Sequence, residues 1–137
     1  MISADKCSLD VGWRESMLKQ EGYDLMGAAF EVYNVLGYGM AEEIYQQSLE
    51  IELGLRGIPF QSKAELNVTY KDQPLRTVYR PDLLVFIEIV VELKAVTALA
   101  SEHVAQLFNY MRISKKKVGY LINFGASTEL EWKRFIL

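Results

Sequence analysis

Three charged side chains interrupt the most apolar stretch of this chain. Residues 80–96 read RPDLLVFIEIVVELKAV, and Asp82, Glu92 and Lys94 stand within or directly beside runs of Val, Ile and Leu. Such near-continuous apolar runs are typical of buried strands. Because an unpaired charge in a buried strand is costly, these three residues need a partner, a metal ion or a function.

The spacing of these residues predicts how they meet. Residues two apart on a strand share a face, so Glu92 and Lys94 point the same way. If the segment is a hairpin that turns at residues 86–88, Asp82 lies opposite Glu92, with Cβ atoms roughly 5 Å apart. Two carboxylates so close repel unless a cation or a proton lies between them, and paired hard oxygens suit Mg²⁺ or Mn²⁺. The alternative is a buried ion pair between one of the acids and Lys94.

Composition limits the class of protein. The chain has 137 residues, half of them hydrophobic, which suits one globular domain with a real core. The net charge of −3 argues against a broad basic surface but not against a local one. The single cysteine, Cys7, excludes an intrachain disulfide and favours a cytoplasmic location. Residues 1–13 lack the apolar core of a signal peptide, and the apolar window 83–100 is too short and too charged to span a bilayer.

Hydrophobic periodicity predicts an α/β domain over residues 16–137 that follows an N-terminal tail of residues 1–15. The connection between the central hairpin and the next strand is long enough for a helical crossover between parallel strands. Ser101 is the predicted N-cap of that crossover helix. The expected helices cover residues 15–36, 40–56 and 102–113, and the expected strands cover 58–70, 75–85, the second arm of the hairpin up to 96, 118–124 and 130–137.

These residues carry a family resemblance. Pro81-Asp82 followed by Glu92-Leu-Lys94 resembles the signature of the PD-(D/E)XK nuclease superfamily. The resemblance implies a restriction-endonuclease-like αβββαβ core, here with an additional N-terminal helix. Further stretches resemble one branch of it, the GxxExxY family of small PD-(D/E)XK proteins, over about residues 16–137. The stretches that carry it are 39–45 (GMAEEIY), 80–85 (RPDLLV), 91–96 (VELKAV), 103–110 (HVAQLFNY), 118–125 (VGYLINFG) and 131–137 (EWKRFIL).

The resemblance implies roles for the charged residues. Asp82 and Glu92 would hold Mg²⁺ or Mn²⁺, with the Leu93 carbonyl as a third ligand. Lys94 would orient the attacking water and stabilise charge on the phosphate, unless it merely neutralises Glu92. Glu42 would reach the same site from its helix, and the alternative is a carboxylate stabilised by the helix N-terminus.

The helix after the hairpin supplies the expected substrate contacts. Gln106 and Tyr110 fit the Q-x-x-x-Y pattern of RecB-like nucleases and would hold the substrate backbone or fix Lys94; otherwise they are a polar flank near solvent. Lys116 would contact phosphates, unless residues 115–117 are only a solvated charge run. His103 is expected to be a packed or surface histidine rather than a ligand. Weaker candidates for phosphate contact are Arg76, Arg80 and Arg112.

The resulting expectation is a cytoplasmic, metal-dependent nuclease-like protein that hydrolyses phosphodiester bonds in nucleic acid, with DNA as the expected substrate. One rival is a catalytically inactive nuclease fold kept as a binding or assembly module, which the acidic net charge favours. A second rival is a non-nuclease enzyme that uses the same carboxylate pair. The apolar hairpin tip at residues 86–88 favours packing against a partner or a second subunit, so a homodimer is a further expectation.

Overall fold

The predicted hairpin lies at the centre of a five-stranded mixed sheet. The computed structural model describes residue 12 and residues 16–137, and in it β4 (Leu83–Val85) pairs antiparallel with β5 (Ile89–Lys94). The turn at residues 86–88 is confirmed, and Phe86 and Ile87 adopt positive φ there. The strand order is β1-β4-β5-β6-β7, and β5 and β6 run parallel across a connection that contains α4, as predicted. The other elements of this layer are β1 (Phe60–Ser62), β6 (Val118–Asn123), β7 (Glu131–Ile136) and α4 (Ser101–Ser114).

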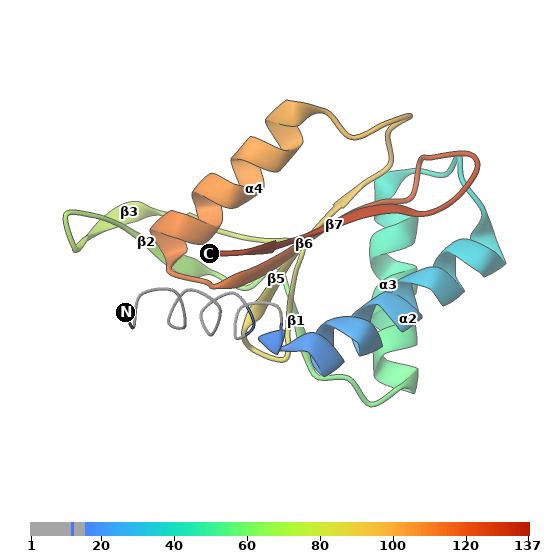
Figure 1. The fold of residues 1–137 in the computed structure, drawn as a ribbon, viewed down its shortest axis with the longest axis horizontal. Helices are drawn as coiled ribbons and strands as arrows, with labels where there is room; N and C mark the ends of the chain where they lie inside the picture. Colours follow the sequence, from blue (N-terminus) through green and yellow to red (C-terminus); the bar gives the residue numbers. More distant parts are fainter. Residues whose placement is uncertain (1–11, 13–15) are drawn as a thin grey trace, which may run out of the picture.

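Helices cover both faces of the sheet. α2 (Lys19–Leu36) and α3 (Glu42–Leu55) pack on one face, and α4 packs on the other (Figure 1). Helical spacing explains the fit of α3, because Tyr45, Leu49 and Leu53 lie four residues apart and are fully buried. The sheet is therefore the middle layer of a three-layer α/β domain.

The two-residue period of β5 sorts its side chains between these layers. Ile89, Val91 and Leu93 join the core beneath α2 and α3, whereas Val90 joins the core beneath α4. Glu92 and Lys94 follow Val90 at two-residue spacing, so they belong to the α4 face.

The predicted strand over residues 75–85 is wrong, because the chain leaves one sheet and enters another within it. β3 (Gln73–Tyr79) pairs only with β2 (Leu66–Tyr70) in a separate two-stranded sheet, and the main sheet resumes at β4. Pro81 lies at the break and has no N–H with which to continue a ladder. The β2–β3 hairpin is thus inserted between β1 and β4, the two adjacent core strands, and packs against α4 (Figure 1).

Two helix starts also differ from expectation. α2 begins at Lys19 rather than near residue 15, after Leu18 adopts a left-handed φ of 52°. Ser101 is the first residue of α4 rather than its cap; the cap position is Ala100, whose N–H donates to Nδ1 of His103 at 3.0 Å. The histidine ring therefore does part of the capping that was expected of the serine.

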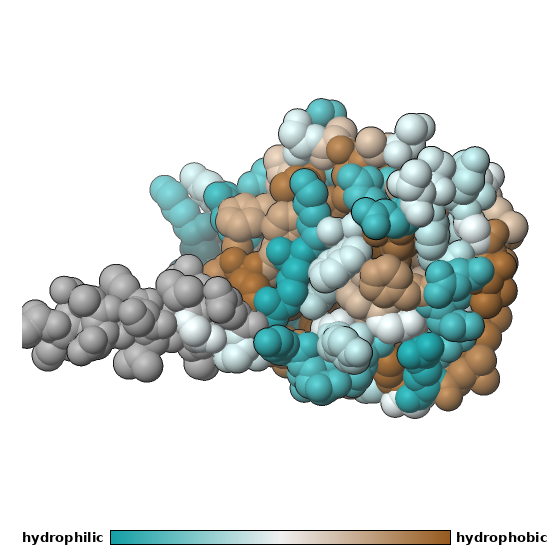
Figure 2. Space-filling view, turned by 45° about the vertical axis from the view of Figure 1, so that its right-hand side comes forward, coloured by the Kyte–Doolittle hydropathy of each residue, from teal (hydrophilic) through white to brown (hydrophobic). Residues whose placement is uncertain are grey.

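The described surface is mixed in character. Figure 2 shows hydrophilic residues interspersed with hydrophobic ones, and Val35, Ile51 and Leu55 are among the exposed apolar residues of α2 and α3. Ile87 at the hairpin tip is 67% exposed. Among the described residues, no helix has the length and apolarity that crossing a membrane requires. Of the predicted tail over residues 1–15, only Gly12 is among the described residues. Cys7 therefore lies outside them.

Candidate active site

The structure brings Asp82 and Glu92 together across the hairpin. Leu83 pairs with Val91, and extending this register by one residue places Asp82 opposite Glu92. Two hydrogen bonds close this end of the hairpin: the Leu93 N–H donates to Oδ2 of Asp82 at 2.7 Å, and the Asp82 N–H donates to Oε1 of Glu92 at 3.1 Å. The two acids therefore lie next to each other at this end of the hairpin, as their spacing predicts.

Lys63, which sequence reasoning missed, is the ion-pair partner of Asp82. Its Nζ lies 2.7 Å from Oδ1 of Asp82, and its backbone N–H donates to the Asp82 carbonyl at 3.2 Å. Lys63 follows β1 with a positive φ of 56°, so a turn after the neighbouring strand delivers this amine to the site. Nothing in the spacing of Lys63 points to Asp82, because only the pairing of β1 with β4 makes them neighbours.

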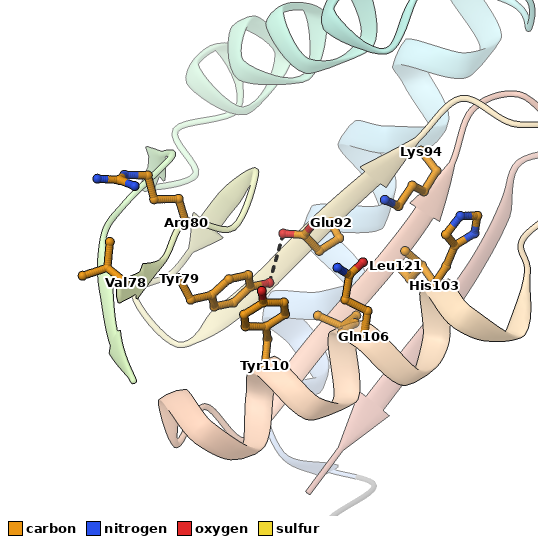
Figure 3. Close-up of a pocket in the computed structure, with 10 residues that line it drawn as sticks. Val78, Tyr79, Arg80, Glu92, Lys94, His103, Gln106, Tyr110 and Leu121 are labelled. Atoms are coloured by element: carbon orange, nitrogen blue, oxygen red, sulfur yellow. Dashed lines mark hydrogen bonds between the residues drawn. The ribbon is translucent and has the colours of Figure 1, made fainter. Parts of the chain in front are cut away.

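Lys94 does not form the ion pair that was the alternative reading. Among the residues that the structure describes, no acid lies within ion-pair distance of its amine. Its side chain instead points into the pocket beside Glu92 (Figure 3). Lys63 thus neutralises Asp82, and the amine of Lys94 remains open to a ligand.

The environment of Glu92 disfavours its charged form. Burial, and then the negative charge of Asp82, raise the pKa of Glu92 to about 7, although hydrogen bonds from Tyr79 and the Asp82 backbone act against this rise. Burial and the charge of Asp82 also raise the pKa of Glu42, at the start of α3. Glu42 is also partly exposed to solvent, so it lies at the rim of the carboxylate pair rather than inside it.

The GxxExxY stretch explains how Glu42 reaches this rim. Gly39 has a φ of 100°, which favours glycine. The Tyr45 hydroxyl donates to the Gly37 carbonyl at 2.6 Å and accepts from the Met40 N–H at 3.2 Å, which fixes the turn before α3. One turn into the helix, the Gln46 side chain donates to the Asp82 carbonyl at 2.9 Å. Gln46 is buried and was also missed, although it directly follows the recognised motif.

A pocket of about 310 Å³ opens beside Glu92, between β5 and α4. Figure 3 shows Gln106, Tyr110 and His103 reaching it from α4, opposite Glu92 and Lys94 on β5. The pocket also has Val78, Tyr79, Arg80, Leu107 and Leu121 in its wall.

Tyr79 connects the small sheet to this pocket and was not predicted as a site residue. Its hydroxyl donates to Oε1 of Glu92 at 3.0 Å, and its ring stacks on Tyr110 with centroids 4.2 Å apart. Burial, followed by the charge of Glu92, raises the pKa of Tyr79 well above its ordinary value, so its hydroxyl is a donor at neutral pH. Its only sequence signal is an aromatic residue at the end of a strand-like run, which is too common to single it out.

The predicted phosphate contacts separate in space. Arg80 lies at the pocket and pairs with Glu65 at 2.6 Å, whereas Lys116 donates to the Ile87 carbonyl at 3.3 Å beside the hairpin tip. The tip precedes β5 and Lys94 ends it, so Lys116 is at the opposite end of the strand from the pocket. Arg76 and Arg112 are exposed and do not line the pocket.

The carboxylate pair fits a magnesium-type cation. Within the described part of the chain, no three Asp, Glu, His or Cys residues form a metal-binding group. Mg²⁺ nevertheless is commonly held by one or two carboxylates together with waters and substrate phosphates. Burial and the charge of Asp82 raise the pKa of Glu92, and a cation bound between the two acids would relieve that repulsion.

Fold and site together define a restriction-endonuclease-like α/β domain. The family model of the PD-(D/E)XK nuclease superfamily matches residues 19–135, so this chain belongs to that superfamily. The crystal structure of SSO0001 is similar in fold, with a TM-score of 0.53 and 19% sequence identity. The match covers 92% of this chain and 60% of that one, so the present chain spans less than two thirds of its length. A search of curated proteins finds no match.

Proposed function

We propose that this protein is a divalent-metal-dependent nuclease that hydrolyses phosphodiester bonds, with DNA as its substrate. The observation that carries the proposal is that Asp82 lies next to Glu92 across the hairpin, beside a lysine that has no described ion-pair partner. Membership of the nuclease superfamily supports the reaction class.

In this proposal Asp82, Glu92 and the Leu93 carbonyl hold Mg²⁺ or Mn²⁺. The ion would supply Lewis-acid polarisation of the phosphate and an activated water. Lys94 orients the water and stabilises negative charge that develops on the phosphate. Glu42, at the rim, orients solvent that enters from the side of α3.

The α4 side of the pocket holds the substrate. Gln106 and Tyr110 contact the sugar-phosphate backbone, and Arg80 adds a positive charge at the pocket mouth. His103 adds a further donor, because its Nδ1 accepts from Ala100 and the proton of the neutral ring is then on Nε2. Lys116 contacts phosphates at a distance from the reacting bond.

Assignment to the GxxExxY branch belongs to the same proposal. The three residues that name the motif have different structural roles. Gly39 adopts the positive φ, Tyr45 fixes the turn before α3, and Glu42 lies at the rim of the carboxylate pair. A cytoplasmic location and a homodimer stay predictions from the sequence.

Cleavage assays test the proposal. Full-length protein with Mg²⁺ or Mn²⁺ is incubated with single- and double-stranded DNA and RNA, and Asp82→Ala, Glu92→Gln and Lys94→Met are each expected to abolish cleavage. Glu88→Gln, at the exposed hairpin tip, and Lys133→Met, at an exposed position of β7, are matched controls that should cleave normally. Wild-type protein that cuts none of these substrates in either metal would refute the proposal.

The rival is a nuclease fold retained as a binding or assembly module. The Lys63–Asp82 ion pair favours it, since Asp82 already has a counter-ion without any metal. Heat denaturation separates the two readings: bound metal should raise the melting temperature of the nuclease, and Glu92→Gln should abolish that rise. A binding module that does not use the site should show no rise in either protein.

A further inference from the structure

Glu92 is oriented by a donor that comes from the other sheet. Oε1 of Glu92 accepts two hydrogen bonds, from the Tyr79 hydroxyl at 3.0 Å and from the Asp82 N–H at 3.1 Å. The described residues give Oε2 no donor, and they include no buried side-chain oxygen or nitrogen that lacks a hydrogen bond. Oε2 is therefore accessible, and the residue that carries it lines the pocket.

Tyr79 is itself held by α4. Its side chain is 6% exposed, and its ring stacks on Tyr110 with an interplanar angle of 12° (Figure 3). The Tyr110 hydroxyl makes no hydrogen bond to Glu92, and the contact that joins Tyr110 to that carboxylate is its stack on the Tyr79 ring. Contacts therefore link three elements in a row. Tyr110 of α4 stacks on Tyr79 of β3, and Tyr79 donates to Glu92 of β5.

We propose that Tyr79 is a positioning residue that fixes Glu92 with Oε2 toward the cation, and that Tyr110 supports the metal site by holding the Tyr79 ring. This inference rests on the proposed function, because it takes Glu92 to be a metal ligand. Without the hydroxyl, the long glutamate side chain would regain rotamer freedom that metal binding must then remove. Residues that orient metal ligands typically change metal affinity by about 10- to 100-fold when they are mutated.

The proposal assigns Tyr110 a role that differs from substrate contact alone. If Tyr110 only touched substrate, its removal would leave metal binding in the absence of nucleic acid unchanged. If it acts through Tyr79, its removal weakens metal binding with no substrate present. Metal affinity of the free protein therefore separates the two roles.

The test is a Mn²⁺ titration of the full chain without nucleic acid, by calorimetry or by the electron paramagnetic resonance signal of free Mn²⁺. Tyr79→Phe keeps the stacked ring and removes the hydroxyl, and it is expected to weaken Mn²⁺ binding by about 10- to 100-fold. Tyr120→Phe is the matched control, because it removes a buried tyrosine hydroxyl on the α2 side of the sheet. That variant should bind Mn²⁺ as wild type does.

A second pair of variants tests whether Tyr110 acts on Glu92 through Tyr79. Tyr110→Phe keeps the ring and should bind Mn²⁺ normally, whereas Tyr110→Ala should bind it more weakly, by less than the loss in Tyr79→Phe. In the Tyr79→Phe background, Tyr110→Ala should add little further loss, since the hydroxyl that it positions is already gone. If Tyr79→Phe fails to fold, which melting without metal would reveal, the single variants Tyr110→Phe and Tyr110→Ala still test the proposal.

The outcomes distinguish this inference from the proposed function. If wild type binds Mn²⁺, Glu92→Gln does not, and Tyr79→Phe matches wild type, the positioning role is overturned and the metal site stands. Independent, additive losses from Tyr79→Phe and Tyr110→Ala would overturn the role of Tyr110. If wild type itself binds no Mn²⁺, both the metal site and the positioning role fail.

Discussion

The two faces of β5 carry opposite kinds of side chain. Toward α2 and α3, Ile89, Val91 and Leu93 are fully buried among apolar neighbours. Toward α4, Val90 is followed by Glu92 and Lys94, and the α4 face ends in a polar pocket. One strand therefore contributes packing on one side and a charged site on the other, and the rigid apolar face can hold the charged face in place.

The comparison predicts that the largest loss of stability comes from the apolar face. Leu93→Ala should lower the free energy of unfolding by about 2–5 kcal/mol, because it leaves a cavity in a fully packed position. Urea denaturation without metal measures this change. A loss below about 1 kcal/mol would mean that the α2–α3 face is not closely packed around β5.

On the charged face, removing a charge should increase stability, whereas removing an apolar side chain from the other face decreases it. Without metal, Glu92→Gln should raise the free energy of unfolding by about 1–3 kcal/mol at pH 8, because it removes a largely buried negative charge beside Asp82. The amide oxygen can still accept from Tyr79 and from the Asp82 backbone.

Added metal should reverse that order. With Mg²⁺ at 1,000 times its dissociation constant, wild type gains about 4.1 kcal/mol, which exceeds that difference, and the variant gains nothing. Melting curves with EDTA and with Mg²⁺ measure both differences. The same order of stabilities under both conditions contradicts a metal site at Glu92.

The two lysines near the acids sharpen the comparison further. Lys63→Met should cost about 1 kcal/mol or less without metal, because its ion pair with Asp82 is half-exposed. The same variant should bind Mn²⁺ more tightly than wild type, since the competing ammonium is gone.

Lys94→Met should change stability by less than about 0.5 kcal/mol, because it breaks no ion pair, and yet should lose cleavage. Equal effects of the two substitutions on cleavage would contradict the division of roles.

The smallest effect is expected away from the pocket. Lys116→Ala should leave stability unchanged within about 0.5 kcal/mol and should weaken DNA binding less than Arg80→Ala does, because Lys116 lies beside the hairpin tip. Fluorescence anisotropy of labelled DNA at several salt concentrations compares the two variants. A phosphate contact by Lys116 would appear as a salt slope reduced by about 1.

Local pattern was sufficient for the hairpin and for its acids. The turn at 86–88 and the period of two place Asp82 and Glu92 together without any knowledge of the remaining chain. The same reasoning failed at residues 75–85, where alternation alone does not reveal which sheet a strand joins. Pro81 lies at the break, but a proline is also compatible with an edge strand. Whether it ends the strand therefore could not be predicted without knowing the partner strand.

The sequence by itself determined the α/β class, the hairpin and the shared face of Glu92 and Lys94, because these follow from the side-chain period of neighbouring residues. Only the tertiary structure decided that Lys63, rather than Lys94, pairs with Asp82, and that Tyr79 from a second sheet orients Glu92. Those contacts join residues on strands that pair or pack across long stretches of chain, and no local period encodes such neighbours.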